Sequence, residues 1–302
     1  MRPVILDTDI GSDVDDILAL VMLAKAPELD LVGITTVYGD TILRAKMARA
    51  TCQMLERPDI DIIPGAPKPI SGRQVYWAGH EGDGIPDLET ISIDSGKKAE
   101  AYLVEKATAR AGEIEILAIG PLTNIAKAIG LSTDFAKQVK QLYIMGGAYW
   151  LDRPEHNIRC DVDAAQTVFE SGIPITAIGL DLTLRVWITE KDVKRIAALP
   201  HQFGKTLENQ IHAWWVFRDL DRNHPHDPLA ALSMIRPELF RFEYCNVTIG
   251  RSGREFGRTI VSDCGTGKVR IASDVFVLTA EKEMVDRIVA VERAVGIATV
   301  RL

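Results

Sequence analysis

The chain reads Val4-Ile5-Leu6-Asp7-Thr8-Asp9-Ile10-Gly11-Ser12-Asp13-Val14-Asp15-Asp16 close to its start. The three apolar residues predict a short buried strand, and five aspartates follow within ten positions where that strand ends. Apolar residues resume from Ile17 to Ala24 and predict a helix that is apolar on nearly every side. A buried strand, a loop and a buried helix are typical of parallel α/β folds, in which ligands bind at the carboxyl ends of the strands.

The alternation of apolar strands and helical patterns continues along the chain. Further strands are predicted at 29–37, 61–63, 114–119, 142–145 and 175–178, and helices at 41–55, 122–129 and 163–170. Near-continuous apolar strands separated by helices indicate a parallel sheet that is covered on both faces. We therefore predict an α/β fold with a doubly wound, mostly parallel open sheet of the Rossmann-like type.

The last third of the sequence is less regular. It predicts short strands at 242–249, 258–261 and 269–272, a helix at 202–220, and a last helix that Thr279 caps and that runs towards Val295. Thr189-Glu190-Lys191-Asp192 resembles a capping box that opens a further helix. We expect helical and β-hairpin elaboration of one domain over residues 1–302, because no linker or repeat interrupts the chain.

Composition excludes several classes of protein. Of 302 residues, 47 % are hydrophobic and 25 % are charged, which is ordinary for a globular protein. The formal charge of −7 is spread along the chain, so no basic groove for nucleic acid is indicated. No apolar run approaches the roughly 18 residues that a membrane span needs. We expect neither a nucleic-acid nor a membrane partner.

Cysteine usage and the N-terminus suggest a location. Cys52, Cys160, Cys245 and Cys264 are far apart and form no close pair, which favours reduced thiols over a disulfide framework or a zinc site. The first residues lack the long apolar core of a signal peptide. We therefore expect a cytoplasmic protein.

The acidic loop predicts a metal site. Helix capping by Asp13 or Asp15 accounts for one or two of its carboxylates and leaves the others unexplained. Gly11 permits a tight loop that would bring these like charges together, where they repel unless a cation lies among them. A hard ion with oxygen ligands, calcium or magnesium, fits this chemistry, and calcium tolerates irregular carboxylate geometry better.

A second acidic signal, His224-Pro225-His226-Asp227-Pro228, lies far downstream. Pro228 suits the first turn of a helix, which would leave Asp227 as its cap. An ordinary histidine titrates near neutral pH, so His226 could transfer a proton.

With these segments in hand, the sequence resembles the inosine-uridine-preferring nucleoside hydrolase family over essentially its whole length. The matching motifs, in order, are Asp7-Thr8-Asp9-Ile10-Gly11 with Asp15-Asp16, Ile119-Gly120-Pro121-Leu122-Thr123-Asn124-Ile125-Ala126, Met145-Gly146-Gly147, Glu155-His156-Asn157 and His226-Asp227-Pro228. The resemblance implies hydrolysis of the N-glycosidic bond of ribonucleosides to ribose and free base. It also implies a homo-oligomer, a dimer or tetramer.

The resemblance implies a role for each matching residue. One calcium ion per chain would be held by Asp9, Asp16, Asp227 and the backbone carbonyl of Ile119, and would bind a water and the 2′- and 3′-hydroxyls of the sugar. Asp9 would be the general base for that water. On the substrate side, the resemblance implies that Asp15 and Asn157 hold ribose hydroxyls, that Glu155 lies near the 5′-hydroxyl, that His226 is the acid for the leaving base, and that His80 is a second base-side histidine.

The sequence departs from the family pattern at several positions. Asp13-Val14 adds two residues to the aspartate loop. Asp40 stands where asparagine is usual after the second strand, close to the expected base, and Arg44 is one helical turn away as a partner. The loop at 147–154 is short and lacks the asparagine of the ribose 5′ side, and His156 replaces a phenylalanine beside the base.

Two other functions remain open from the sequence alone. A phosphatase of the haloacid-dehalogenase type also begins with a strand and Asp-x-Asp, but it would leave His226-Asp227 without a role. A non-catalytic ribonucleoside-binding protein would use the same pocket, but binding alone needs neither Asp9 nor His226.

Overall fold

The computed structural model describes residues 1–290. The strands are β1 (Arg2–Thr8), β2 (Leu29–Thr36), β3 (Asp61–Pro64), β4 (Glu115–Ala118), β5 (Gln141–Met145), β6 (Ile175–Ile178), β7 (Ile188–Thr189), β8 (Arg222–Asn223), β9 (Phe240–Ile249), β10 (Thr259–Ser262) and β11 (Val269–Val275). The helices are α1 (Asp15–Lys25), α2 (Thr41–Met54), α3 (Ala99–Ala109), α4 (Thr123–Leu131), α5 (Phe135–Gln138), α6 (His156–Cys160), α7 (Val162–Glu170), α8 (Leu180–Thr183), α9 (Glu190–Ala197), α10 (His201–Arg218), α11 (His226–Ile235) and α12 (Val277–Val289).

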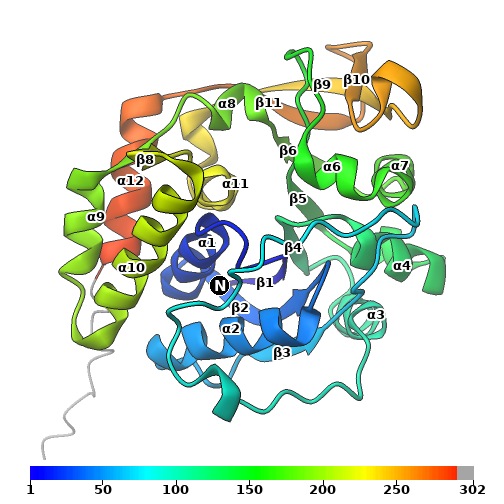
Figure 1. The fold of residues 1–302 in the computed structure, drawn as a ribbon. Coiled ribbons are helices and arrows are strands. Elements are labelled where there is room, and N and C mark those ends of the chain that lie inside the picture. Colours follow the sequence, from blue (N-terminus) through cyan, green and yellow to red (C-terminus); the bar gives the residue numbers. More distant parts are fainter. Residues whose placement is uncertain (291–302) are drawn as a thin grey trace, which may run out of the picture.

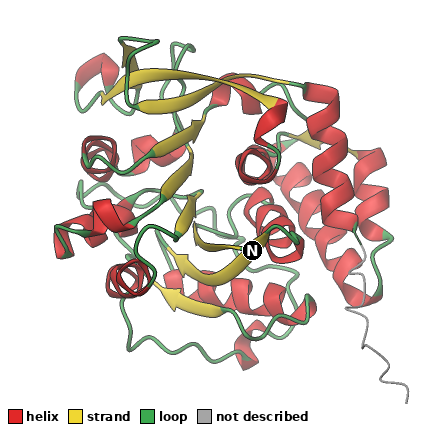
Figure 2. Cartoon of the chain, turned by 180° about the vertical axis from the view of Figure 1, so that it is seen from behind, coloured by secondary structure: helices red, strands yellow, loops and turns green. Residues whose placement is uncertain are grey.

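The main sheet has the strand order β10-β9-β11-β6-β5-β4-β1-β2-β3. The seven neighbouring strands β11, β6, β5, β4, β1, β2 and β3 pair in parallel. Strand β9 pairs antiparallel with both β11 and β10. Helices cover both faces of the sheet, with α1, α11 and α12 on one side and α3, α4 and α7 on the other (Figures 1 and 2). The predicted doubly wound α/β fold with a β-hairpin elaboration is confirmed.

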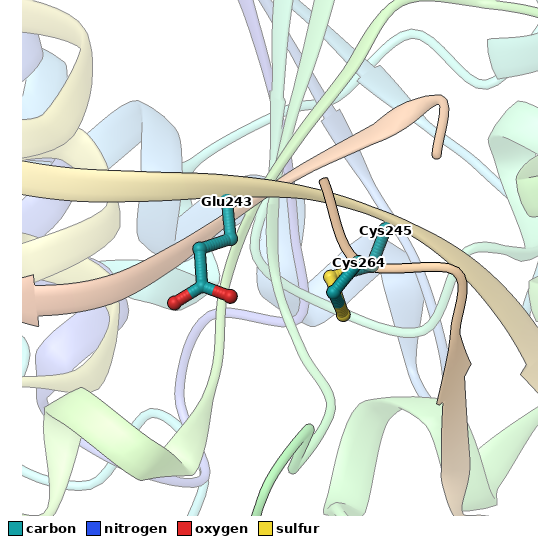
Figure 3. Close-up of side chains that lie close together, drawn as sticks. All are labelled: Glu243, Cys245 and Cys264. Carbon is teal, nitrogen blue, oxygen red and sulfur yellow. A yellow bond between two sulfur atoms is a disulfide. The ribbon is translucent and has the colours of Figure 1, made fainter. Parts of the chain in front are cut away.

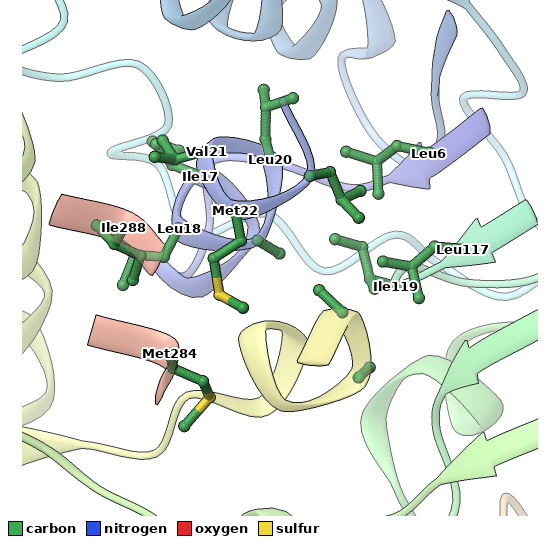
Figure 4. Packing of buried hydrophobic residues seen from close by; sticks show 14 of the residues in the cluster. Leu6, Ile17, Leu18, Leu20, Val21, Met22, Leu117, Ile119, Met284 and Ile288 are labelled. Carbon is green, nitrogen blue, oxygen red and sulfur yellow. The ribbon is translucent and has the colours of Figure 1, made fainter. Parts of the chain in front are cut away.

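Helix α1 carries the packing of the first face. Its apolar side chains are buried on every side, because the helix lies between the sheet and helices α11 and α12. Figure 4 shows Leu18 and Met22 of α1 beside Met284 and Ile288 of α12. This burial explains why a helix with eight consecutive apolar residues, from Ile17 to Ala24, and no polar stripe is stable here. It also fixes the start of α1, and with it the acidic loop, against the sheet.

Several predicted boundaries need correction. The capping box at Thr189 and Asp192 is confirmed. Asp227, however, does not cap α11: Pro225 is the N-cap, and Asp227 lies in the first turn. Helix α12 begins at Val277, so Thr279 does not cap it either, and the predicted extension to Val295 lies outside the described residues.

The expectation of four reduced cysteines is wrong. Cys245 and Cys264 form a disulfide, whereas Cys52 and Cys160 are free and buried. Antiparallel pairing places Ser262 opposite Asn246, so the chain that follows β10 passes directly beside β9 (Figure 3). A separation of 19 residues in sequence thereby becomes 4.1 Å between the two Cα atoms. The disulfide removes the cysteine-based argument for a reducing compartment.

Within residues 1–290, no helix has the length and apolar character to cross a membrane. The assignment of one domain to residues 1–302 extends past the described residues and stays a prediction.

Candidate active site

The two acidic signals of the sequence meet at the carboxyl ends of the parallel strands. Asp15 and Asp16 are the first residues of α1, and Asp227 lies in the first turn of α11, which packs against α1. Carboxylate oxygens of these three residues lie within 4.8 Å of one another, and all three side chains are buried. Asp9 follows β1 and lies in the same cavity. We call Asp9, Asp15, Asp16 and Asp227 the carboxylate floor.

The carboxylate floor has few internal partners. The Thr8 hydroxyl donates to Asp16 over 2.5 Å, and the Asp227 backbone N–H donates to Asp15 over 3.1 Å. Within residues 1–290, Asp15, Asp16 and Asp227 form no ion pair. Burial raises the pKa of Asp15, Asp16 and Asp227 well above the ordinary value of 3.8, and repulsion from neighbouring aspartates raises it further. Buried oxygen donors of one charge fit a divalent hard cation.

Arg44 holds the acidic loop from the side of α2. Its side chain is fully buried and donates to the backbone carbonyls of Asp9 and Ile10, to the carbonyl of Tyr38 and to the hydroxyl of Ser12. The guanidinium therefore binds mainly backbone oxygens of the loop, and its positive charge partly offsets the aspartates around it. The sequence analysis did not predict this role.

A cavity of about 510 Å³ opens above the carboxylate floor. Its lining also includes Ser12, Asp13, Tyr38, Tyr76, Ala78, Ile119, Met145, Arg153, Pro154, Glu155, His156, Asn157, Leu180, Leu184, Trp214, Arg218, His224 and His226. Cavities of this size hold small organic ligands. The predicted site residues except His80 and Asp40 thus line one cavity.

Ile119, Asn157 and Glu155 are tied to one another on the sheet side of this cavity. The Asn157 side-chain amide donates to the Ile119 carbonyl over 2.7 Å and to the Met145 carbonyl over 3.2 Å. Glu155 caps α6 and accepts backbone N–H groups of Asn157 at 2.8 Å, Ile158 at 3.0 Å and Gly147 at 3.1 Å. These bonds fix both side chains before any substrate binds.

Two of the three histidines that line the cavity, His156 and His226, have different surroundings. The Nδ1 atom of His226 lies 2.7 Å from the Thr183 hydroxyl, and burial lowers the pKa of His226 to about 3, with His224 and Arg153 adding to the effect. By contrast, a hydrogen bond with Cys160 raises the pKa of His156 to about 9. We call His156 and His226 the histidine wall.

A family model described as "inosine-uridine preferring nucleoside hydrolase" matches residues 4–292. The chain belongs to this family.

Relatives of this hydrolase carry related names. It is 33 % identical to "Probable uridine nucleosidase 2" of Oryza sativa subsp. japonica over 277 residues, which is 85 % of this chain and 80 % of the relative. The structure described as "Plant nucleoside hydrolase - PpNRh1 enzyme" superposes with a TM-score of 0.86 at 28 % identity, over 96 % of this chain and 99 % of the other. "Purine-Preferring Ribonucleoside Hydrolase from Gardnerella vaginalis" gives a TM-score of 0.86 at 28 % identity, over 95 % and 98 %.

Family membership establishes the general activity of the chain. It is an enzyme that hydrolyses ribonucleosides. The dehalogenase-like phosphatase and the non-catalytic binding protein are left without support.

Two predicted site residues of the hydrolase lie outside the cavity lining. Asp40 is exposed and caps α2, because its carboxylate accepts the Leu43 N–H over 2.9 Å. The expected pairing with Arg44 does not form. His80 lies behind the acidic loop, with its Nε2 atom 2.9 Å from the Ser12 carbonyl and its ring centroid 4.4 Å from that of Phe217.

Sequence reasoning missed several residues that line the cavity of the hydrolase or lie beside it. Tyr38 lies two residues after the end of β2, where polar residues of a parallel sheet face a ligand site, and it adopts a left-handed conformation with a φ of 68°. Cys160 lies one helical turn after His156, and that spacing was a signal that the two side chains meet. Arg153 offered no such signal, since it lies in an irregular loop.

Proposed function

We propose that this chain is a calcium-dependent nucleoside N-ribohydrolase, in which water attacks C1′ of a ribonucleoside to give ribose and free base. The observation that carries the proposal is the convergence of Asp15, Asp16 and Asp227 within 4.8 Å at the base of a cavity of about 510 Å³. Family membership supplies the reaction, and the buried oxygen donors supply the argument for a metal.

The donor set agrees with calcium rather than with zinc. Its expected ligands are Asp9, Asp16, Asp227 and the carbonyl of Ile119, all of which offer hard oxygen atoms. The Ile119 carbonyl already accepts the Asn157 amide, and its second lone pair would serve the ion. When bound, calcium supplies Lewis-acid chemistry and neutralises the charge of the floor.

The chain's own residues have separate tasks in this proposal. Asp9 takes the proton of the attacking water, and the floor stabilises positive charge on the ribosyl group as the bond to the base breaks. Asp15 and Asn157 hold ribose hydroxyls, and Glu155 lies towards the 5′-hydroxyl.

The leaving base also needs a partner on the other side of the bond. We assign His226 as its hydrogen-bond donor, because burial lowers the pKa of His226 to about 3 and leaves the ring neutral near pH 7. One ring nitrogen of His226 is at Thr183, which leaves the other nitrogen for the base. His80 would act only indirectly, through the acidic loop that it contacts.

A turnover screen tests the proposed function. Purified protein is incubated with uridine, cytidine, inosine and adenosine, with calcium or with a chelator, and released ribose is measured as reducing sugar. We expect turnover of at least one nucleoside, abolished by the chelator and restored by calcium. No ribose from any nucleoside would overturn the activity, and full activity in chelator would overturn the metal.

Two further expectations stay predictions. The resemblance implies a dimer or tetramer, which light scattering of the purified chain measures. Residence in the cytoplasm is the other, and the disulfide removes the cysteine argument for it.

A further inference from the structure

His156, which stands where the family usually has a phenylalanine, makes contacts that a phenylalanine ring could not make. It is the first residue of α6, lines the cavity and meets the ring of Tyr76 edge-on at 6.2 Å between centroids. Its Nε2 atom lies 3.5 Å from the Sγ atom of Cys160. Its Nδ1 atom has no hydrogen-bond partner within residues 1–290. One side of the imidazole is therefore anchored to the protein, and the other makes no hydrogen bond to residues 1–290.

Cys160 is placed to hold that ring. It is the last residue of α6, one turn after His156, and its buried side chain packs against Val37 and Tyr38. Because the helix and this packing fix the sulfur atom, a bond to it restricts rotation of the His156 ring. Asp9 and Glu155 also face His156 and favour its charged form, in addition to the Cys160 bond that raises its pKa to about 9.

We infer that His156 is a second proton donor to the leaving base, and that Cys160 positions its ring for this transfer. The inference rests on the proposed function. When the bond from C1′ to the base nitrogen breaks, its electron pair stays on the base, and a proton passes from His156 to the base. The oxygen of water bonds to C1′, and the proton of water passes to Asp9. Asp9 then releases this proton to solvent, and His156 regains a proton from solvent.

The arrangement divides the work of the histidine wall. His226 is held by a neutral hydroxyl, and it contributes a hydrogen bond to the base. His156 is surrounded by a thiol and two carboxylates, and it contributes a mobile proton and positive charge. Negative charge that develops on a base leaving the ribose is stabilised by such a cation beside it.

The test separates proton donation from ring packing. His156→Phe keeps an aromatic ring of the kind usual at this position in the resembling family, but it cannot donate. Each enzyme is assayed on its best nucleoside and on 4-nitrophenyl riboside, whose leaving group departs without a proton. We expect His156→Phe to lower kcat on the nucleoside by about 10²-fold and on the activated riboside by less than about threefold. His212→Phe, at an exposed histidine paired with Glu190, is the matched control and should change neither rate.

The outcomes are distinguishable. Retention of both rates in His156→Phe would show that only the ring matters, and equal losses on both substrates would show a structural role; either result overturns the inference. If the unaltered enzyme cleaves neither substrate, the proposed function itself fails.

Variants of Cys160 test the positioning step. Cys160→Ser keeps a group that can bond to the imidazole, whereas Cys160→Ala does not. We expect Cys160→Ala to lower nucleoside turnover by about 3- to 10-fold, in the same leaving-group-selective way, and Cys160→Ser to restore most of it. Cys52→Ala, at the other free buried cysteine, is the control and should leave the ratio of the two rates unchanged. An unchanged ratio in Cys160→Ala would overturn the positioning role.

Discussion

The carboxylate floor and the histidine wall face the same cavity, but their electrostatic environments differ. The floor brings like charges together, and Asp15, Asp16 and Asp227 form no ion pair within residues 1–290. In the wall, each histidine has one hydrogen-bonding partner, Thr183 for His226 and Cys160 for His156. The floor is therefore unfavourable in the absence of a cation, whereas one nitrogen of each wall histidine already has a partner in the folded chain. In the proposed mechanism, the metal and the leaving base are therefore handled by separate sets of residues.

The largest expected effect comes from the floor. Asp9→Asn should lower kcat by about 10³-fold or more, because an amide cannot accept the proton of the attacking water. The fold should persist, since Arg44 binds the backbone carbonyl of residue 9 and not its side chain. Steady-state kinetics with circular dichroism check both statements. Hydrolysis near the unaltered rate would remove Asp9 from the base role and break the comparison.

The wall should respond more weakly and in a substrate-dependent way. His226→Ala should lower turnover of nucleosides by about 10²-fold, and turnover of 4-nitrophenyl riboside by much less, because only the former needs help with its leaving group. Rates on the two substrates for the same variant provide the measurement. Equal losses would place His226 with the floor, in binding or structure.

The third expected effect is on the thermal stability of the protein, which should depend on pH through the carboxylate floor. Burial raises the folded-state pKa of the floor aspartates above 3.8, and raises the pKa of the neighbouring Asp13 to about 7. A carboxyl whose pKa is higher in the folded chain stabilises it below pH 4, and that stability is lost as pH rises towards 7 and beyond. In chelator the melting temperature should thus fall between pH 5 and pH 8, and calcium should restore more of it at pH 8.

Thermal melts at the two pH values, with chelator and with calcium, measure this difference. Asp16→Asn is the matched variant and should reduce both the pH dependence and the calcium effect. A calcium effect that is equal at pH 5 and pH 8 would contradict the account of the floor.

The smallest effect is expected at an aspartate outside both regions. Asp40→Asn should change kcat/KM by less than about twofold and the free energy of unfolding by less than about 0.5 kcal/mol, because asparagine caps a helix as well as aspartate does. Kinetics and denaturant unfolding of this variant test whether the acids of the floor are special. A large loss of kcat/KM would contradict this and would show that Asp40 contributes to the active site.

The parallel half of the fold was predictable because its cause is local. Each buried strand is a short apolar run, so the sequence pattern at 4–6 or 142–145 is itself the reason for burial. Helix α3 was nonetheless missed, although its buried Ala99, Tyr102, Leu103 and Ala107 follow a helical period. The acidic loop was found for the same local reason, since five like charges stand close in sequence.

Features that depend on long-range register could not be predicted. The disulfide between Cys245 and Cys264 exists because two strands pair in one register, which spacing alone does not reveal. Spacing also suggested that Arg44 serves Asp40, whereas the helix turns Arg44 inward to the loop and leaves Asp40 at its exposed start. The position of a neighbour along a helix does not determine what the rest of the fold brings closer.

The buried guanidinium of Arg44 has a consequence for how the enzyme acquires its ion. Its bonds to the carbonyls of Asp9 and Ile10 shape the loop through backbone contacts that need no cation. The donor groups of the proposed metal site are therefore assembled in advance, and we expect ion uptake to be a docking event rather than the completion of folding. We also expect that the ion can be removed and rebound repeatedly without denaturing the protein.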